Sequence, residues 1–305
     1  MNVLLAVDQS RNSLAAARWV QELHLPAGSV LSLLHVFELK QWPELPLFGD
    51  VQQFQEKLVP LRAKVTAKAR RFISRMAESF HGQRLEIQAN VVEGLPGGEI
   101  LTAIEQHPID LVVVGTKGLS AMKRFLLGSV SEWVLSDAHC SVLLVRGQPC
   151  WTGRKTRNMR VLLATDGSHD SKLAVTLLKS LNLPKAADLT IIHVVERHPT
   201  LTTAAWLTGH VDATQLAENM KRTLEQAGKQ LLQETQQALS KKKLEVDILL
   251  THGHVAEDIL KTAKRSRADL IVVGSKGLTG LRRFLLGSVA HKVARHAPCS
   301  VLVVR

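Results

Sequence analysis

The chain has few of the residues on which several common protein classes depend. Its 305 residues include three cysteines and no tyrosine, and aromatic side chains make up 4%. Cysteines so few and scattered (Cys140, Cys150 and Cys299) do not form the disulfide framework of a small secreted domain. So little aromatic surface also argues against a nucleic-acid-binding module that stacks bases, and no recognition motif for nucleic acid is present.

Long hydrophobic runs are missing as well. No apolar stretch approaches the roughly 18 residues that a membrane span needs. The first residues reach the charged Asp8 without a basic segment, which does not fit a secretory signal peptide. Because hydrophobic residues nevertheless make up 45% of the chain, we expect a globular, cytoplasmic protein with no membrane partner.

The net charge is +12, which favours anionic partners. Part of this charge lies in runs such as 62–75 and 241–243. Runs of this kind are most often a solvated helix face. Other basic residues flank glycines, where they fit a binding loop better.

A long segment occurs twice in the chain. Residues 115–146 and 274–305 are 159 positions apart and agree at 19 of 32 positions without a gap. Each copy carries the pattern G-x2-G-x9-G-S. A repeat of this period has the size of a domain, so the chain consists of two copies of one domain. We predict domains at 1–147 and 158–305, joined by a linker at 148–157.

Each half alternates apolar runs with segments of helical periodicity. In the first half, strands are predicted at 3–7, 30–37, 85–92, 110–114 and 140–145, helices at 13–23, 51–80, 99–107 and 128–137, and a turn at 94–98. The second half repeats this order. Continuous Val, Leu and Ile strands between helices are typical of a parallel sheet covered on both faces. The sequence therefore predicts the α/β class.

Acidic residues and glycines follow the strands at the positions where such sheets bind ligands. Asp8 and Asp166 follow the first strand of each half, and Gly115 and Gly274 end the fourth. Parallel sheets bind ligands beyond the carboxyl ends of their strands, at a topological switch point. We therefore predict one site in each half.

The glycine motif has the composition of a phosphate-binding loop. Glycine lets backbone N–H groups approach a ligand closely. The helices that open at Gly128-Ser129 and Gly287-Ser288 add free N–H groups and the positive end of a helix dipole. Two purely structural tight turns are the alternative explanation. The basic residues within the two motifs are Lys117, Lys123, Arg124, Lys276, Arg282 and Arg283.

Asp8 and Asp166 have the wrong sign to hold phosphate. We expect them on ribose hydroxyls or on a magnesium ion that accompanies the nucleotide, with no metal held by protein ligands alone. Neither half contains the P-loop pattern or the G-x-G-x-x-G fingerprint of dinucleotide-binding domains.

On four features the chain resembles the universal stress protein family, in the tandem two-domain form of its ATP-binding branch. They are the glycine motif, the ends of the first and second strands, and the closing Cys-Ser-Val-Leu strand, all present in both halves. The first strands end in Val7-Asp8-Gln9-Ser10 and Thr165-Asp166-Gly167-Ser168, and the second strands in Leu34-His35-Val36 and Ile192-His193-Val194. Together these features span almost the whole chain.

The resemblance implies two Rossmann-like domains of the adenine nucleotide alpha hydrolase-like type. Each would have a five-stranded parallel sheet of order 3-2-1-4-5 with helices on both faces, and would bind ATP. By carry-over, Asp8 and Asp166 would contact ribose, and Val36 and Val194 would line the adenine pocket. The phosphates would be surrounded by Gly115, Gly118, Gly128, Ser129 and Val130 in the first half, and by Gly274, Gly277, Gly287, Ser288 and Val289 in the second.

Three functions fit these observations to different degrees. The leading hypothesis is a regulatory stress-response protein that binds ATP without efficient catalysis, since no nucleophile has an adjacent base near the motif. Slow ATP hydrolysis or autophosphorylation on Ser129 or Ser288 would be a side activity. The alternatives are a scaffold with empty sites and, less well supported, a basic nucleic-acid-binding module. As family members commonly pair through the last strand, the halves would form an internal pseudo-dimer, with a homodimer and an unidentified regulatory protein as further partners.

Recurring histidines and cysteines are better explained by structure than by chemistry. His35 and His193 occupy equivalent strand ends, where we expect them to be hydrogen-bonded. Cys140 and Cys299 open equivalent strands and are expected in the core. The pair His252 and His254 has no cluster of further ligands in the sequence, which argues against a zinc site.

Overall fold

The computed structural model describes residues 1–38, 51–116, 127–151, 157–181, 183–184, 187–196, 211–240, 245–278 and 286–305. These residues divide into two compact units, one that ends at Gln148 and one that begins at Pro149. We keep 147 and 158 as the proposed limits of the two domains.

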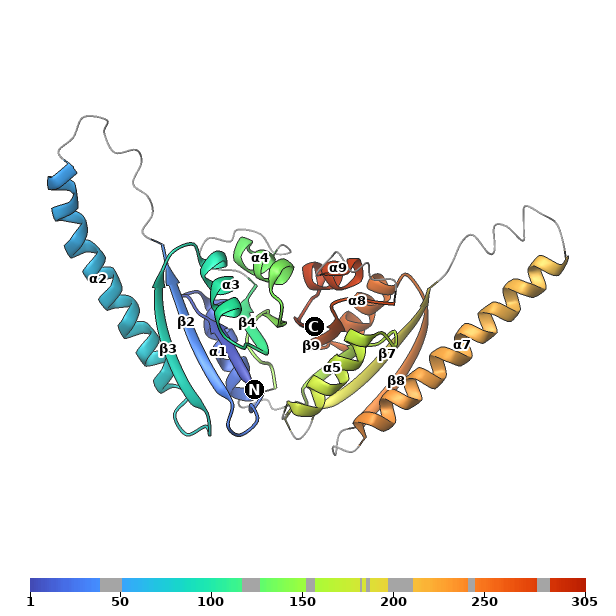
Figure 1. The fold of residues 1–305 in the computed structure, drawn as a ribbon. Coiled ribbons are helices and arrows are strands. Elements are labelled where there is room, and N and C mark those ends of the chain that lie inside the picture. Colours follow the sequence, from blue (N-terminus) through green and yellow to red (C-terminus); the bar gives the residue numbers. More distant parts are fainter. Residues whose placement is uncertain are drawn as a thin grey trace. The chain divides into compact units, whose positions relative to one another are not determined.

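The first unit alternates strands and helices, as the sequence predicts (Figure 1). Strands β1 (Asn2–Ala6), β4 (Leu111–Gly115) and β5 (Ser141–Val145) consist mostly of Val and Leu. Adjacent residues such as Leu4 and Leu5 are both buried, which requires cover on both faces of the sheet. The elements are β1 (Asn2–Ala6), α1 (Arg11–Glu22), β2 (Val30–Phe37), α2 (Val51–Glu78), β3 (Glu86–Glu93), α3 (Pro96–Gln106), β4 (Leu111–Gly115), α4 (Ser129–Asp137) and β5 (Ser141–Val145).

All strand pairs within this unit are parallel. The sheet order is β3-β2-β1-β4-β5. Strand β1 pairs with β2 on one side and with β4 on the other, so the order reverses direction at β1 and β4. This is the topological switch point at which ligands of open α/β sheets bind.

The second unit repeats the fold. Its sheet order is β8-β7-β6-β9-β10, again with parallel pairs. The predicted α/β class with two Rossmann-like domains is therefore confirmed. The elements are β6 (Arg160–Ala164), α5 (His169–Ser180), β7 (Asp188–Glu196), α7 (Val211–Leu239), β8 (Glu245–Gly253), α8 (Val255–Ser266), β9 (Leu270–Gly274), α9 (Ser288–His296) and β10 (Ser300–Val304).

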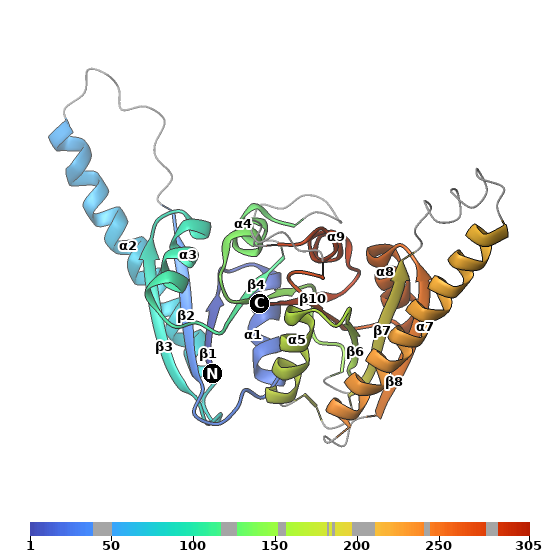
Figure 2. The same cartoon turned by 45° about the vertical axis from the view of Figure 1, so that its right-hand side comes forward.

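Helices cover the sheets in the same way in both units. Helix α2 packs on β2 and β3 and α1 on β4 and β5, while α3 packs on α4 (Figure 2). In the second unit, α7 packs on β7 and β8, α5 on β9 and β10, and α8 on α9. Within the described ranges, no helix combines the length and apolar character needed to cross a bilayer.

The turn predicted at 94–98 is only partly correct. Gly94 leaves strand β3 with φ of 159°, but α3 already begins at Pro96. Proline is well tolerated at the first helical position, because its missing N–H would have no partner there. The two following glycines therefore continue a helix, although their composition suggested a loop.

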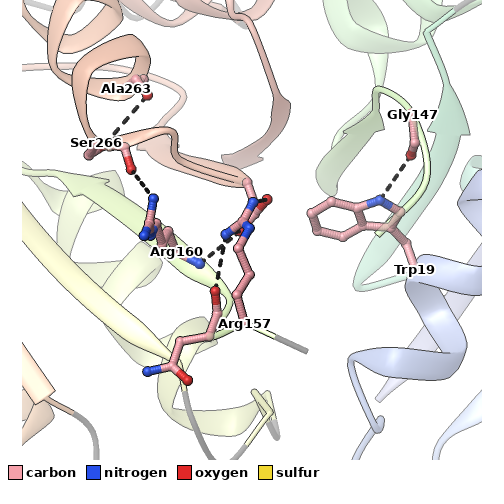
Figure 3. Close-up of polar contacts among 8 residues, drawn as sticks. Trp19, Gly147, Arg157, Arg160, Ala263 and Ser266 are labelled. Atoms are coloured by element: carbon pink, nitrogen blue, oxygen red, sulfur yellow. Dashed lines mark hydrogen bonds and ion pairs between the residues drawn. The ribbon is translucent and has the colours of Figure 1, made fainter. Parts of the chain in front are cut away.

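Both ends of the connection between the units are fixed to the unit beside them (Figure 3). The buried Trp19 of α1 donates its indole N–H to the carbonyl of Gly147 at 3.2 Å. Arg157 donates from both terminal nitrogens to Asp269, at 2.8 and 2.6 Å. This hydrogen bonding raises the pKa of Arg157 above its ordinary value, because the carboxylate stabilises the charged guanidinium.

Candidate functional site

A short turn after the first strand of each unit orients an aspartate. The backbone N–H of Ser10 donates to Asp8 Oδ1 at 2.9 Å, and Ser168 donates to Asp166 Oδ1 at 3.0 Å. Each is an Asx turn, in which a carboxylate binds the backbone two residues on. The same serines cap the next helix, since Ser10 accepts from the N–H of Ser13 and Ser168 from that of Ser171. Both aspartates are thus held at a strand end.

The fourth strand of each unit ends in a glycine that packs on this capped helix. A Cβ built on Gly115 would lie 2.9 Å from the backbone carbon of Asn12. A Cβ on Gly274 would lie 2.8 Å from the backbone of Asp170 and Ser171. Because backbone atoms cannot move aside like a side chain, only glycine fits. The close neighbour of both glycines is thus the protein's own backbone, and their predicted approach to a phosphate stays a prediction.

The residue after this glycine joins three elements. The N–H of Thr116 donates to Val145 at the end of β5, and its carbonyl accepts from the N–H of Gly128 at 2.7 Å. Ser275 repeats both bonds, to Val304 and from Gly287, each at 2.7 Å. The start of the last helix is thereby fixed beside the end of the fourth strand in both units.

In the second unit, Asp170 holds the backbone of the glycine turn. Its Oδ2 atom accepts from the hydroxyl of Ser275 at 2.7 Å and from the N–H of Lys276 at 3.0 Å. The hydroxyl of Ser168 donates to the carbonyl of Lys276 at 3.2 Å. Ser275 is 1% exposed, so this part of the turn is firmly placed.

Asp166 meets the same turn further on. Its Oδ2 atom accepts from the N–H of Leu278 at 3.2 Å, and a Cβ on Gly277 would lie 2.8 Å from this oxygen. The structure therefore brings together Asp166, Gly274 and Gly277, three residues predicted for the second site. Two backbone N–H groups occupy one lone pair on each oxygen of Asp166, which leaves further acceptor sites on the carboxylate.

The last helix of each unit begins without a capping side chain. Gly128 and Gly287 are the N-cap residues of α4 and α9, and neither helix has a side-chain cap hydrogen bond. Ser129 and Ser288 occupy the first helical position and are exposed, followed by the half-buried Val130 and Val289. An uncapped first turn offers N–H groups to an anion.

The residue predicted for the adenine pocket lies on the second strand of each unit, which pairs with the third. Val36 of β2 is opposite Val92, and Val194 of β7 is opposite Thr251. Beside them, Nδ1 of His35 lies 2.7 Å from the carbonyl of Val7, and Nδ1 of His193 lies 2.8 Å from that of Thr165. The histidines are hydrogen-bonded at strand ends, as predicted, and Cys140 and Cys299 are buried.

Part of each glycine motif lies outside the described ranges. Gly118, Lys117, Lys123 and Arg124 of the first motif, and Arg282 and Arg283 of the second, lie outside the described residues. Among the described residues, no group of three or more His, Cys, Asp and Glu side chains is placed to hold a metal ion.

Sequence reasoning missed Asp170 and its equivalent Asn12. A signal was present, because each lies four residues after the strand-end aspartate, where both halves have a polar residue. A polar residue in the first turn of a helix is ordinary, so this position alone does not predict a role. Only the position of the turn on this helix shows what Asp170 binds.

Comparison with known proteins identifies the family of this fold. The profile described as "Universal stress protein family" matches residues 1–146 and again 157–305. The chain therefore belongs to the universal stress protein family and contains two of its domains in tandem.

Individual relatives agree with this assignment. A universal stress protein of Mycolicibacterium smegmatis is 28% identical over 99% of this chain and 96% of its own length. Universal stress protein YxiE of Bacillus subtilis is 34% identical, over 48% of this chain and 98% of its own. A crystal structure of a universal stress protein from Archaeoglobus fulgidus covers 100% of this chain and 98% of its own, with a TM-score of 0.63 and 22% identity. At that identity the structural likeness concerns the fold.

Proposed function

We propose that each unit binds ATP at the switch point of its sheet and that the protein is a regulatory stress protein without efficient catalysis. Asp8 and Asp166 would accept hydrogen bonds from ribose hydroxyls. Val36 and Val194 would contact adenine. The glycine turns, with Gly118 and Gly277, and the first turns of α4 and α9 would bind the phosphates, with magnesium as a counter-ion brought by the nucleotide.

The observation that carries this proposal is the position of the uncapped starts of α4 and α9 beside the strand-end glycine turns, where Gly128 and Gly287 donate to Thr116 and Ser275. Helices α3 and α8 also lack a side-chain cap but begin at Leu95 and His254 instead of at a glycine of the motif. Helices α1 and α5 use their own serines to bind the N–H groups of their first turns. Helices α4 and α9 have glycine at the same position and no side-chain cap hydrogen bond. Hydrogen bonds to charged groups contribute about 1.5–3 kcal/mol each, so three or four suffice for the roughly 8 kcal/mol of micromolar binding.

A regulatory role requires that ATP bind two states of the protein with different affinity. The repeat supports a proposed arrangement in which the two units pair with one another as an internal pseudo-dimer, and two chains could associate further. The protein that responds to this state would recognise a surface that nucleotide occupancy changes.

Catalysis is proposed to be at most slow. A serine at the first helical position, Ser129 or Ser288, could accept a phosphoryl group, which would appear as labelled protein after incubation with γ-labelled ATP. Release of labelled phosphate without labelled protein would indicate hydrolysis instead. If neither labelled protein nor labelled phosphate forms, the sites bind ATP without turning it over.

The direct test is to denature the purified protein and to identify any released nucleotide by chromatography and mass. We expect ATP, with one molecule for each filled site. A protein without released nucleotide that also shows no calorimetric binding of Mg-ATP at millimolar concentration would contradict the proposal. It would leave the scaffold function as the better explanation.

The variant Gly277→Ala tests whether Asp166 and Gly277 belong to the ATP site of the second unit. Gly277→Ala places a Cβ 2.8 Å from Asp166 Oδ2 and must displace the carboxylate. We expect about tenfold weaker ATP binding at this site, equivalent to the loss of one net hydrogen bond. Gly98→Ala is the matched control, because its Cβ meets its nearest neighbour at 3.8 Å. Equal affinity of the two variants would exclude Asp166 and Gly277 from the site.

A further inference from the structure

Helix α2 carries a continuous basic stripe on its solvent face. Lys64, Lys68, Arg71 and Arg75 follow each other at intervals of four, three and four residues, and all four are exposed. This spacing places them along one side of a helix over about 16 Å, three turns. The basic stripe therefore presents four positive charges in one direction.

The opposite side of α2 carries the residues that the fold needs. Ala69, Ile73 and Met76 of α2, together with Phe80 two residues beyond its end, have the same spacing and are all buried, and α2 packs on β2 and β3 (Figure 1). Each lies five residues after a member of the basic stripe, which is about 140° around the helix. The basic stripe points away from the sheet and takes no part in the core.

Acidic side chains are few along the basic stripe. Glu78, which is exposed and lies three residues after Arg75, is the acidic residue of α2 that continues the same spacing. Between positions 62 and 75, the exposed residues of α2 are six Lys or Arg, two Ala and one Ser. Arg62 forms an ion pair with Glu93 at 2.6 Å. Within the described part of the chain, none of the four stripe residues forms an ion pair. Their charges are thus available to an external partner.

The second unit shows that the fold does not require this charge. The residues 159 positions after Ala69, Ile73, Met76 and Phe80 are Gly228, Leu232, Thr235 and Leu239, and all are buried as in the first unit. The residues 159 positions after the basic stripe are Thr223, Ala227, Gln230 and Glu234, all exposed and none basic. One repeat has acquired, or the other has lost, a cationic face on the same scaffold.

The chemistry of the basic stripe favours a duplex nucleic acid over a bilayer or a single strand. An interfacial helix inserts an apolar face into the membrane, but the apolar face of α2 is already buried. A single strand requires aromatic stacking platforms, and aromatic residues make up only 4% of the chain. A duplex has about ten phosphates along 16 Å of its axis and is bound through its backbone by Lys and Arg alone.

We propose that the basic stripe of α2 is a sequence-independent docking surface for the phosphate backbone of a nucleic-acid duplex. Binding would release counter-ions from about four phosphates, so that its affinity falls about a hundredfold between 50 and 200 mM salt. The docking surface is separate from the glycine turns and does not depend on nucleotide binding there.

The test is fluorescence anisotropy of a labelled 25-base-pair DNA duplex of mixed sequence, titrated with the full chain at both salt concentrations. Replacing Lys64, Lys68, Arg71 and Arg75 with Gln should weaken binding about a hundredfold at the lower salt and flatten the salt dependence. The control variant replaces Arg222, Lys229, Lys264 and Arg265, four exposed residues of the second unit, with Gln. Both variants lose four charges, from +12 to +8, and the control should lose less than about fivefold.

Other outcomes would overturn the proposal. Equal losses in the two variants would mean that net charge alone attracts DNA. Binding to vesicles with anionic lipids but not to the duplex would assign the basic stripe to a membrane. Competition by saturating Mg-ATP would place the duplex at the glycine turns. Since all four side chains are exposed, the urea midpoint of the stripe variant should equal that of the wild type, which checks that its fold is intact.

Discussion

The two glycine turns use one construction with different polar partners. In both units the strand-end glycine packs on the first turn of the capped helix, and the next residue joins the last strand to the last helix. The residue under the turn is Asn12 in the first unit and Asp170 in the second, and the residue after the aspartate is Gln9 or Gly167. The backbone arrangement is therefore the constant feature, and the polar side chains around it vary.

The reason for this difference is steric. A strand-end glycine in contact with backbone has no replacement, whereas a hydrogen bond to the turn needs only an acceptor at the right place. The single Oδ2 atom of Asp170 accepts both bonds from the turn. An amide oxygen could do the same, so Asn and Asp are equivalent in geometry and differ in charge.

The largest loss of stability is expected from a substitution at Gly274, where the strand end packs on the capped helix. Gly274→Ala forces a Cβ against the backbone of Asp170 and Ser171, and we expect the second unit to lose about 2 kcal/mol in free energy of unfolding. Gly115→Ala should cost a similar amount in the first unit. Urea unfolding measures both, with Gly98→Ala as the tolerated control. A loss at one glycine but not at the other would show that the two turns are built differently.

Substitutions of Asp170 test the polar residue that differs between the two glycine turns. Asp170→Ala leaves the hydroxyl of the buried Ser275 and the N–H of Lys276 without their acceptor, which should cost about 1.5 kcal/mol and weaken ATP binding at the second site. Asp170→Asn should restore both, because it recreates the residue of the first unit. His169→Ala, an exposed neighbour on the same helix, is the control. Failure of the Asn variant to rescue would show that the charge matters, and not only the acceptor.

A smaller effect is expected after the strand-end aspartates. Gly167 has φ of +78°, whereas Gln9 is not among the described residues with positive φ. Gly167→Gln should therefore destabilise the second unit by about 1 kcal/mol, the cost of a side chain in the left-handed region. Gln9→Gly should have less effect. Thermal unfolding of the two variants compares them, and equal effects would contradict the different turn conformations.

The smallest expected effect is a pH dependence of stability that the second unit has because of one ion pair between helices. Helices α8 and α9 are joined by Lys292 and Glu257 at 3.1 Å, while at the equivalent positions of the first unit Trp133 of α4 lies against α3 at Gly97 and beside Gly98. The hydrogen bond from Lys292 and its charge lower the pKa of Glu257. The contribution of Glu257 to stability is thus present above the pKa of an unfolded glutamate and is lost as the pH falls through the lower folded value.

Carbon-detected NMR titration of the Glu257 carboxyl group measures this shift. Lys292→Met should raise the pKa of Glu257 toward its ordinary value, because Lys292 is the largest cause of the shift and His254 and Lys261 lower the pKa less. High salt should weaken the interaction because the pair is exposed. A pKa that is unchanged in the Met variant would mean that another group causes the shift.

Much of the fold could be predicted from the sequence, because its main signals are local. Continuous Val and Leu runs predict buried parallel strands, and the domain-sized repeat supplied each assignment twice. The start of α3 was mispredicted, since Gly and Pro are breakers in a helix interior but are acceptable in its first turn. Asp8 and Asp166 could be placed at strand ends because chain order and strand direction alone determine that position.

Contacts between segments distant in the sequence could not be predicted in the same way. The bonds of Asp170 to Ser275 and Lys276 span more than 100 residues and depend on how β9 ends over α5. The charge run in α2 was visible, but its four-residue stripe has meaning only once the buried face of the helix is known. The contrast with α7 then separates what the fold requires from what it does not.

The anchored connection between the units has an evolutionary consequence. Trp19 ties Gly147 to the first unit and Asp269 ties Arg157 to the second, so each half contains the groups that fasten its own end of the chain. A gene split between codons 152 and 156 would leave both fastenings whole in the two products. The junction is thus a position at which the gene could be divided while each product keeps the hydrogen bonds that hold its own end of the connection.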